Sequence, residues 1–144
     1  TIDPTAAIAA TTRIGEGVTV HPQAAVLQGV TLGDNVRIGA GAIVENTVIL
    51  SDVTVNSGAV LTDCIVGANA TIGANTTIKG GPTDVVLNDE VYHDVTFGGL
   101  LGDNVAVGAN VTVQPGTIVG TNATVGDGTF VGGRIDDGAH VTRG

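Results

Sequence analysis

One short segment of the chain gathers several side chains that can move a proton. It contains His93, which lies between Tyr92 and Asp94, with Asp84 a few residues earlier. An imidazole titrates near neutral pH, so it can take a proton from an attacking amine or hydroxyl, and a carboxylate beside it can orient the ring. We therefore predict His93 as a general base oriented by Asp84 or Asp94. The alternative is an exposed loop histidine without a chemical role.

Four further positions are candidate substrate contacts: Lys79, Asp84, Tyr92 and Asn110. Lys79, the only lysine, is suited to attract a phosphate, although a solvated lysine is an equally good interpretation. Tyr92 is suited to contact a sugar or shield the site, unless it only packs under the loop. Asn110 competes with a simpler interpretation as a turn residue, because Asn tolerates a left-handed backbone.

The sequence does not favour metal or cysteine chemistry. The histidines at 21, 93 and 140 include no closely spaced pair, so we expect no metal ion. Cys64 is the only cysteine, which excludes an internal disulfide. It falls on a small inward position of the repeat described below, so we expect a core residue and not a nucleophile.

Composition narrows the class of protein. The chain has 144 residues, a net charge of -9, 42% hydrophobic but only 2% aromatic residues, and 23 Gly. One domain is expected, and one interpretation of it is a piece of a longer chain. Because the chain has only five Lys and Arg residues, its composition disfavours nucleic acid and anionic membranes as partners. No apolar run approaches a membrane span and no signal peptide is visible, so a cytoplasmic location is expected. The acidic, lysine-poor composition suits a halophilic source, the alternative being an ordinary acidic domain.

A six-residue repeat organises the chain. An aliphatic residue recurs every six positions, and the residue four positions later is small or β-branched. Neither a helix nor a simple strand gives this period. After Val44 the count slips by one, and we expect it to slip again at Val60. The expected inward aliphatic positions are Ile2, Ile8, Ile14, Val20, Val26, Leu32, Ile38, Val44, Ile49, Val55, Val60, Val66, Ile72, Ile78, Leu101, Val107, Val113, Val119, Val125, Val131, Ile135 and Val141.

Short turns separate the aliphatic positions, and their third residue is usually Gly or Asn, which adopt a left-handed backbone at least cost. Examples are the third residues Gly17, Asn35, Gly41, Asn75, Asn104 and Gly128. Each repeat is therefore predicted to be a short strand followed by a sharp corner. Three repeats, about 18 residues, close one coil of a parallel β-helix, and the chain provides about seven coils.

The repeat stops over residues 79–100. The middle of this segment, Val85–Tyr92, predicts a small β-hairpin around Asn88 and Asp89. Gly80, Gly81, Gly98 and Gly99 mark its exit and re-entry. Insertions of this kind often lie on the binding face of a solenoid. A decorative loop and a subunit contact are the alternatives.

Strings such as Ile38-Gly-Ala-Gly-Ala and Leu101-Gly-Asp-Asn-Val resemble the signature of hexapeptide-repeat left-handed β-helix proteins. The resemblance implies an all-β, single-stranded left-handed parallel β-helix with one extruded loop, and a homotrimer. The stretch from Gly99 to Gly116 is most similar to the C-terminal acetyltransferase domain of archaeal sugar-1-phosphate nucleotidylyltransferases.

This second resemblance implies an acyl-CoA-dependent acyltransferase that uses acetyl-CoA as co-substrate and a sugar phosphate or amino sugar as acceptor. In that family a His in an Asn-x-Arg-His-Asp string is the general base, whereas residues 80–84 read Gly-Gly-Pro-Thr-Asp here. His93 is then the remaining candidate base. The alternative function is a non-catalytic β-helix that trimerises or rigidifies a larger protein.

Overall fold

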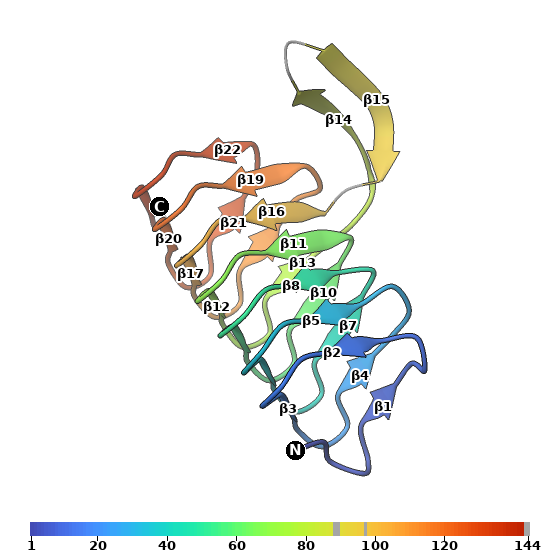
Figure 1. Cartoon of the computed structure of the whole chain (residues 1–144). Helices are drawn as coiled ribbons and strands as arrows, with labels where there is room; N and C mark the ends of the chain where they lie inside the picture. The colour runs from blue at the N-terminus through green and yellow to red at the C-terminus, as the bar shows by residue number, and fades with distance from the viewer. Residues whose placement is uncertain (88–89, 97, 143–144) are drawn as a thin grey trace.

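A computed structural model describes residues 1–87, 90–96 and 98–142, and for the strands within 82–96 it describes the backbone only. The chain winds around one axis through three parallel seven-stranded sheets, with the two termini at opposite ends (Figure 1). Each coil takes one strand from each sheet. The predicted left-handed parallel β-helix of about seven coils is confirmed.

The strands are short, and most have two residues. Sheet 1 contains β1 (Ala7–Ile8), β4 (Ala25–Val26), β7 (Ile43–Glu45), β10 (Val60–Thr62), β13 (Thr77–Ile78), β18 (Thr112–Val113) and β21 (Phe130–Val131). Sheet 2 contains β2 (Arg13–Ile14), β5 (Thr31–Leu32), β8 (Val48–Ile49), β11 (Cys64–Val66), β16 (Gly99–Leu101), β19 (Thr117–Val119) and β22 (Arg134–Ile135). Sheet 3 contains β3 (Thr19–Val20), β6 (Arg37–Ile38), β9 (Thr54–Val55), β12 (Thr71–Ile72), β17 (Ala106–Val107), β20 (Thr124–Val125) and β23 (His140–Val141).

The core is a thin prism filled by the repeat positions. Ile38, Val55 and Ile72 stack in successive coils and are fully buried, as are the small residues Ala42 and Ala59. Each buried Val, Leu or Ile contributes roughly 1.5–3 kcal/mol of transfer free energy. A prism this narrow excludes rings, and Phe130, which the repeat places outward, is 67% exposed. The low aromatic content is therefore a consequence of the fold.

The corners have the expected left-handed residues. All six third-turn residues singled out in the sequence have φ between 59° and 72°. Ten non-glycine residues in the described part of the chain have positive φ, and seven of them are Asn, the residue that tolerates this conformation best after Gly. The other three are Gln23, Asp52 and Asp63, which are residue types not expected at these corners.

Two predicted boundaries were wrong. The second slip follows Leu61, which is fully buried, whereas Val60 is half-buried and faces outward. The step from Leu61 to Val66 is shortened because the corner between them is one residue short.

The insertion also ends before residue 99, because Gly99 and Leu100 pair with Cys64 and Ile65 as part of β16. The inserted segment is therefore 79–98.

A candidate functional site at the base of the hairpin

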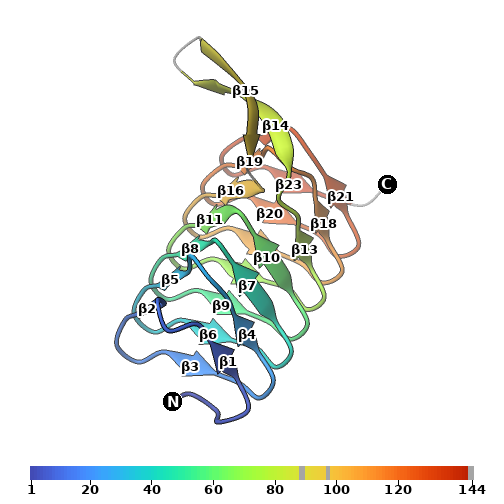
Figure 2. The ribbon, with the colours of Figure 1, turned by 90° about the vertical axis from the view of Figure 1, so that its right-hand side faces the viewer.

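The insertion is an antiparallel hairpin that projects from the solenoid (Figures 1 and 2). Its strands are β14 (Pro82–Leu87) and β15 (Glu90–Thr96), which confirms the predicted hairpin. It leaves after β13 and returns at β16, so it replaces a corner between sheet 1 and sheet 2. We call the stack of corners joining these two sheets the hairpin edge.

Hydrogen bonds to the coil below hold the hairpin base. The Gly80 N–H donates to Thr62 Oγ1 (2.7 Å), and the Thr62 hydroxyl donates to the Ile78 carbonyl (3.1 Å). The Gly98 N–H donates to the Asp63 carbonyl (2.7 Å). A Cβ on Gly80 would collide with the Asp63 carboxylate, and one on Gly98 with the Thr62 carbonyl oxygen. Glycines at both hinges therefore let the hairpin leave and rejoin the stack without opening it.

The strand register places the candidate catalytic residues together. Val85 pairs with Tyr92 and Thr83 pairs with Val95, with an irregularity between them. Asp84 therefore lies opposite His93 and Asp94, two residues against one, as in a β-bulge. The side chains of Asp84, Tyr92 and His93 lie outside the described residues, so the structure supports their proximity through the backbone register alone.

The other two predicted contacts lie at opposite ends of two neighbouring strands of sheet 1, Lys79 after β13 and Asn110 before β18. Lys79 is exposed at the hairpin exit, where its N–H donates to the Val113 carbonyl (3.3 Å). Asn110 is exposed at the corner that precedes β18, with φ 57°. The structure therefore brings Lys79 to the hairpin base but not Asn110, whose backbone conformation alone accounts for an asparagine.

Shortened corners create a groove below the hairpin. Where one coil turns through Leu27, Gln28 and Gly29, the next turns through Glu45 and Asn46 only. The coil after that turns through Thr62 and Asp63. The two slips in the six-residue count mark these short corners in the sequence, but the groove follows only from their stacking in successive coils.

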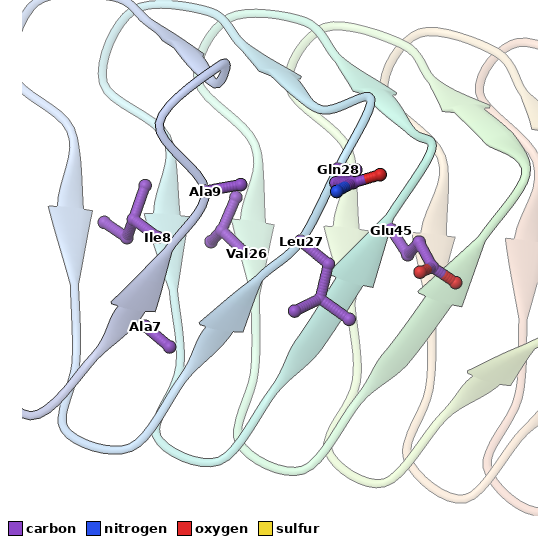
Figure 3. Close-up of a pocket in the computed structure, with 7 residues that line it drawn as sticks. All are labelled: Ala7, Ile8, Ala9, Val26, Leu27, Gln28 and Glu45. Atoms are coloured by element: carbon purple, nitrogen blue, oxygen red, sulfur yellow. The ribbon is translucent and has the colours of Figure 1, made fainter.

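Two adjoining hollows make up the groove. A polar hollow of about 390 Å³ is lined by Gln28, Gly29, Glu45, Asn46 and Asp63. An apolar hollow of about 440 Å³ continues from it towards the N-terminal coil, and the two share Gln28 and Glu45 (Figure 3). Apolar walls with a few polar groups are typical of small-molecule sites. The apolar hollow is lined by Ala7, Ile8, Ala9, Val26, Leu27, Gln28 and Glu45.

Cys64 is not equipped for nucleophilic chemistry. It is buried, and its Sγ lies 3.5 Å from the Thr47 hydroxyl. Burial raises the pKa of the thiol to about 11, so the thiol is protonated at neutral pH. The expectation of a core cysteine is confirmed.

Sheet 2 presents an apolar outer face. Val48, Ile65, Leu100 and Ile118 occupy the same outward position in four successive coils and pair in that order. Val48 is 37% and Ile65 is 42% exposed. The equivalent positions of sheet 3 are mainly polar. Sheet 2 therefore presents apolar side chains on its outer face where sheet 3 presents polar ones. Those sheet 3 positions are Thr19, Arg37, Thr54, Thr71, Ala106, Thr124 and His140.

Two kinds of feature are absent from the described part of the chain. No group of three or more His, Cys, Asp or Glu side chains in it has the arrangement of a metal site. Nor does it contain a helix long and apolar enough to cross a membrane.

Family comparisons divide the chain at the hairpin. Residues 8–97 match the family described as "GMPPB C-terminal domain". Residues 98–133 match "Bacterial transferase hexapeptide (six repeats)".

Two curated proteins are similar over 46% of this chain. A probable mannose-1-phosphate guanyltransferase of Schizosaccharomyces pombe is 35% identical over 72 residues. The bifunctional protein GlmU of Sorangium cellulosum is 38% identical over 66 residues. The matches cover 17% and 14% of those proteins, so this chain corresponds to a small part of their length.

Solved structures share the fold. A hexapeptide transferase family protein from Anaplasma phagocytophilum has a TM-score of 0.73 at 22% identity, over 92% of this chain and 73% of that one. PerB from Caulobacter crescentus, in complex with CoA and GDP-perosamine, has a TM-score of 0.62 at 24% identity, over 99% and 53%. The acetyltransferase domain of PglB from Neisseria gonorrhoeae, in complex with acetyl coenzyme A, has a TM-score of 0.61 at 22% identity, over the same shares.

Proposed function

Since this chain belongs to the GMPPB C-terminal domain family, we propose that it is an acyl-CoA-dependent acyltransferase domain acting on a sugar phosphate or amino sugar. We further propose that it forms the C-terminal part of a sugar-phosphate nucleotidylyltransferase, as the similarity to two sugar nucleotidyltransferases supports. The observation that carries the proposal is the hairpin, whose backbone register sets Asp84 opposite His93 and Asp94 and whose base adjoins a groove through Asp63.

The groove fits an acyl-CoA in chemical character. Its apolar part suits the methylenes of an extended acyl-bearing arm, and Gln28 and Asn46 offer amide partners to a ligand that itself contains amides. Fold neighbours that were solved with CoA or acetyl coenzyme A support the same ligand class.

The proposed reaction is acyl transfer to an amine or hydroxyl of the acceptor. His93 removes the acceptor proton as the nucleophile attacks the thioester carbonyl, and Asp84 or Asp94 holds the imidazole in the required tautomer. The carbon–sulfur bond breaks, an amide or ester forms, and the proton passes to the departing thiolate. Lys79, exposed at the hairpin exit, attracts the acceptor phosphate, and Tyr92 and Asn110 are the further proposed substrate contacts.

One assay tests the activity. The natural protein is incubated with acetyl-CoA and amino-sugar phosphates in low-salt and molar KCl buffers, and CoA release is followed. We expect turnover that His93→Ala lowers by a factor of about 10²–10⁴, the usual contribution of a general base. His140→Ala is the matched control, because His140 is an exposed histidine on sheet 3. No turnover in the natural protein would overturn the proposal, and turnover unaffected by His93→Ala would remove His93 as the base.

A non-catalytic trimerisation domain is the second candidate, and the apolar outer face of sheet 2 supports it. Val48, Ile65, Leu100 and Ile118 form a continuous strip, which Arg134 follows at one end and Thr31 and then Arg13 follow at the other. Exposed apolar patches of this kind mark protein interfaces. We propose that two further copies of the chain cover it. A homotrimer is compatible with both candidates, so only the turnover assay separates them.

A further inference from the structure

The corners of this solenoid share a capping hydrogen bond. At several corners the middle residue's N–H is accepted by a side chain from the same position of the next coil. At four of them the acceptor is an aspartate carboxylate, at 2.8–2.9 Å. A middle-corner N–H is thus a natural partner for a negatively charged oxygen. The four donor–acceptor pairs are Glu16 with Asp34, Ala68 with Asp103, Ala109 with Asp127, and Thr121 with Asp137.

Three successive corners between sheet 3 and sheet 1, with Ala40, Ser57 and Ala74 as middle residues, lack this cap in the described part of the chain, and the first two line a hollow. Within the described residues, the N–H groups of Ala40 and Ser57 have no protein acceptor. The next coil places Ser57 above Ala40 and Ala74 above Ser57, so neither position provides a carboxylate. Both Ala40 and Ser57 are exposed.

A hollow of about 200 Å³ lies at these two corners. It includes the first residues of three successive corners, His21, Gly39 and Asn56. Its lining therefore brings an imidazole, a guanidinium, an amide and a hydroxyl around the two uncapped N–H groups. The lining residues are His21, Arg37, Gly39, Ala40, Val55, Asn56 and Ser57.

We propose that this hollow binds the phosphate group of a phosphate ester. Arg37 presents the planar fork of donors that matches a phosphate, and Ser57 provides a hydroxyl. Adjacent backbone N–H groups at a turn form the kind of concavity that holds anions. These donors lie together although the chain has a net charge of -9 and only five Lys and Arg residues. The phosphate oxygen takes the place that an aspartate carboxylate fills at the capped corners.

One negative charge near His21 is already engaged. Asp3 lies close enough to His21 to interact electrostatically. Its carboxylate accepts hydrogen bonds from the Thr5 hydroxyl (2.6 Å) and the Thr5 N–H (2.8 Å), which hold the pKa of Asp3 below its usual value. Asp3 is therefore satisfied by Thr5 and is not among the residues that line the hollow.

This site is separate from the hairpin. It lies at corners before the sheet 1 strands, whereas the hairpin edge lies after them. The proposal therefore does not depend on acyl transfer, and a failed turnover assay leaves it standing.

Amide NMR with three probes tests the proposal at constant ionic strength: inorganic phosphate, a sugar 1-phosphate and CoA. We expect saturable shifts of the Ala40 and Ser57 N–H signals with each probe. Tighter binding of the sugar phosphate or of CoA identifies the source of the phosphate. The absence of a saturable shift at these two amides would overturn the proposal.

Two variants locate the site, each with a matched control. Arg37→Gln should weaken phosphate binding by at least about fivefold, whereas Arg13→Gln, the same change at the equivalent strand position of sheet 2, should not. Ser57→Asp provides the missing carboxylate cap, so it should abolish binding while leaving the fold at least as stable. Ala68→Asp adds the same charge at another corner and should leave binding intact. Equal weakening by a variant and its control would contradict the assignment.

Discussion

Asn46 and Asp63 are joined across two successive coils by a 2.7 Å hydrogen bond from Asn46 Nδ2 to Asp63 Oδ1. Both residues have a left-handed backbone, with φ 49° and 54°. Each turns a corner that is one residue short, and the Asp63 carbonyl then accepts the Gly98 N–H at the hairpin base. The pair therefore connects the floor of the groove to the hinge of the hairpin.

Substitutions at Asp63 separate backbone strain from the lost hydrogen bond. Asp63→Gly removes the acceptor but keeps a backbone that tolerates positive φ, and we expect a loss of about 1 kcal/mol in unfolding free energy. Asp63→Ala adds the cost of a left-handed alanine, for a total of about 2–3 kcal/mol. Urea unfolding of both variants measures the difference. Equal losses would mean that positive φ carries no cost at this corner.

We expect the hairpin to be dispensable for folding. Gln114–Gly116 shows that an ordinary corner spans the same place one coil later, so replacing residues 79–98 with Gln-Pro-Gly should close the coil. We expect a folded β-solenoid by circular dichroism, with a midpoint of thermal unfolding close to that of the natural protein. Because the proposed base is removed, CoA release should be lost. An unfolded variant would show instead that the hairpin stabilises the stack.

The inward register can be checked directly at two neighbouring residues. Leu61 is fully buried and Val60 is half-buried on the outer face. Leu61→Ala should cost about 2–5 kcal/mol of unfolding free energy because it leaves a cavity in the prism. Val60→Ala should cost less than about 1 kcal/mol. The opposite order would restore the register that the sequence first suggested.

The register of Val60 and Leu61 shows which parts of the fold can be predicted from the sequence alone. The six-residue period predicted the fold, the number of coils, most of the core and the left-handed corners, because each is dictated locally by spacing and by Gly or Asn. Placing the second slip required choosing between Val60 and Leu61, two adjacent aliphatic residues. The choice depends on which corner is short, and that depends on pairing with Glu45 one coil away.

The same limit applies to the sites. The hairpin was predictable because it interrupts a regular pattern, and Asp84 and His93 could be singled out by residue type. The groove of Gln28 and Asp63 could not, because it arises from two shortened corners stacked in space. The uncapped N–H groups of Ala40 and Ser57 become visible only when each corner is compared with the next coil.

The apolar outer face predicts the state of assembly. Ile65→Asp places a charge in the middle of the strip formed by Val48, Ile65, Leu100 and Ile118, and should convert a trimer to a monomer in sedimentation velocity experiments. Thr54→Asp, an outward position of sheet 3, is the control and should leave the trimer intact. A natural protein that sediments as a monomer would exclude this interface.

Cys64 predicts a specific loss of stability in alkaline solution. Burial raises the pKa of its thiol in the folded protein from 9.0 to about 11. Below pH 9 the thiol is protonated in both the folded and unfolded states, so it adds no pH dependence. Between about pH 9 and 11 the unfolded state loses the proton first, so the free energy of unfolding falls as pH rises, by about 2–3 kcal/mol in total.

Urea unfolding of the natural protein and of Cys64→Ala across this range measures the effect. Other groups titrate in both proteins, so the difference between the two slopes isolates the thiol. Parallel slopes would show that the Cys64 thiol ionises as easily in the folded chain as in the unfolded one.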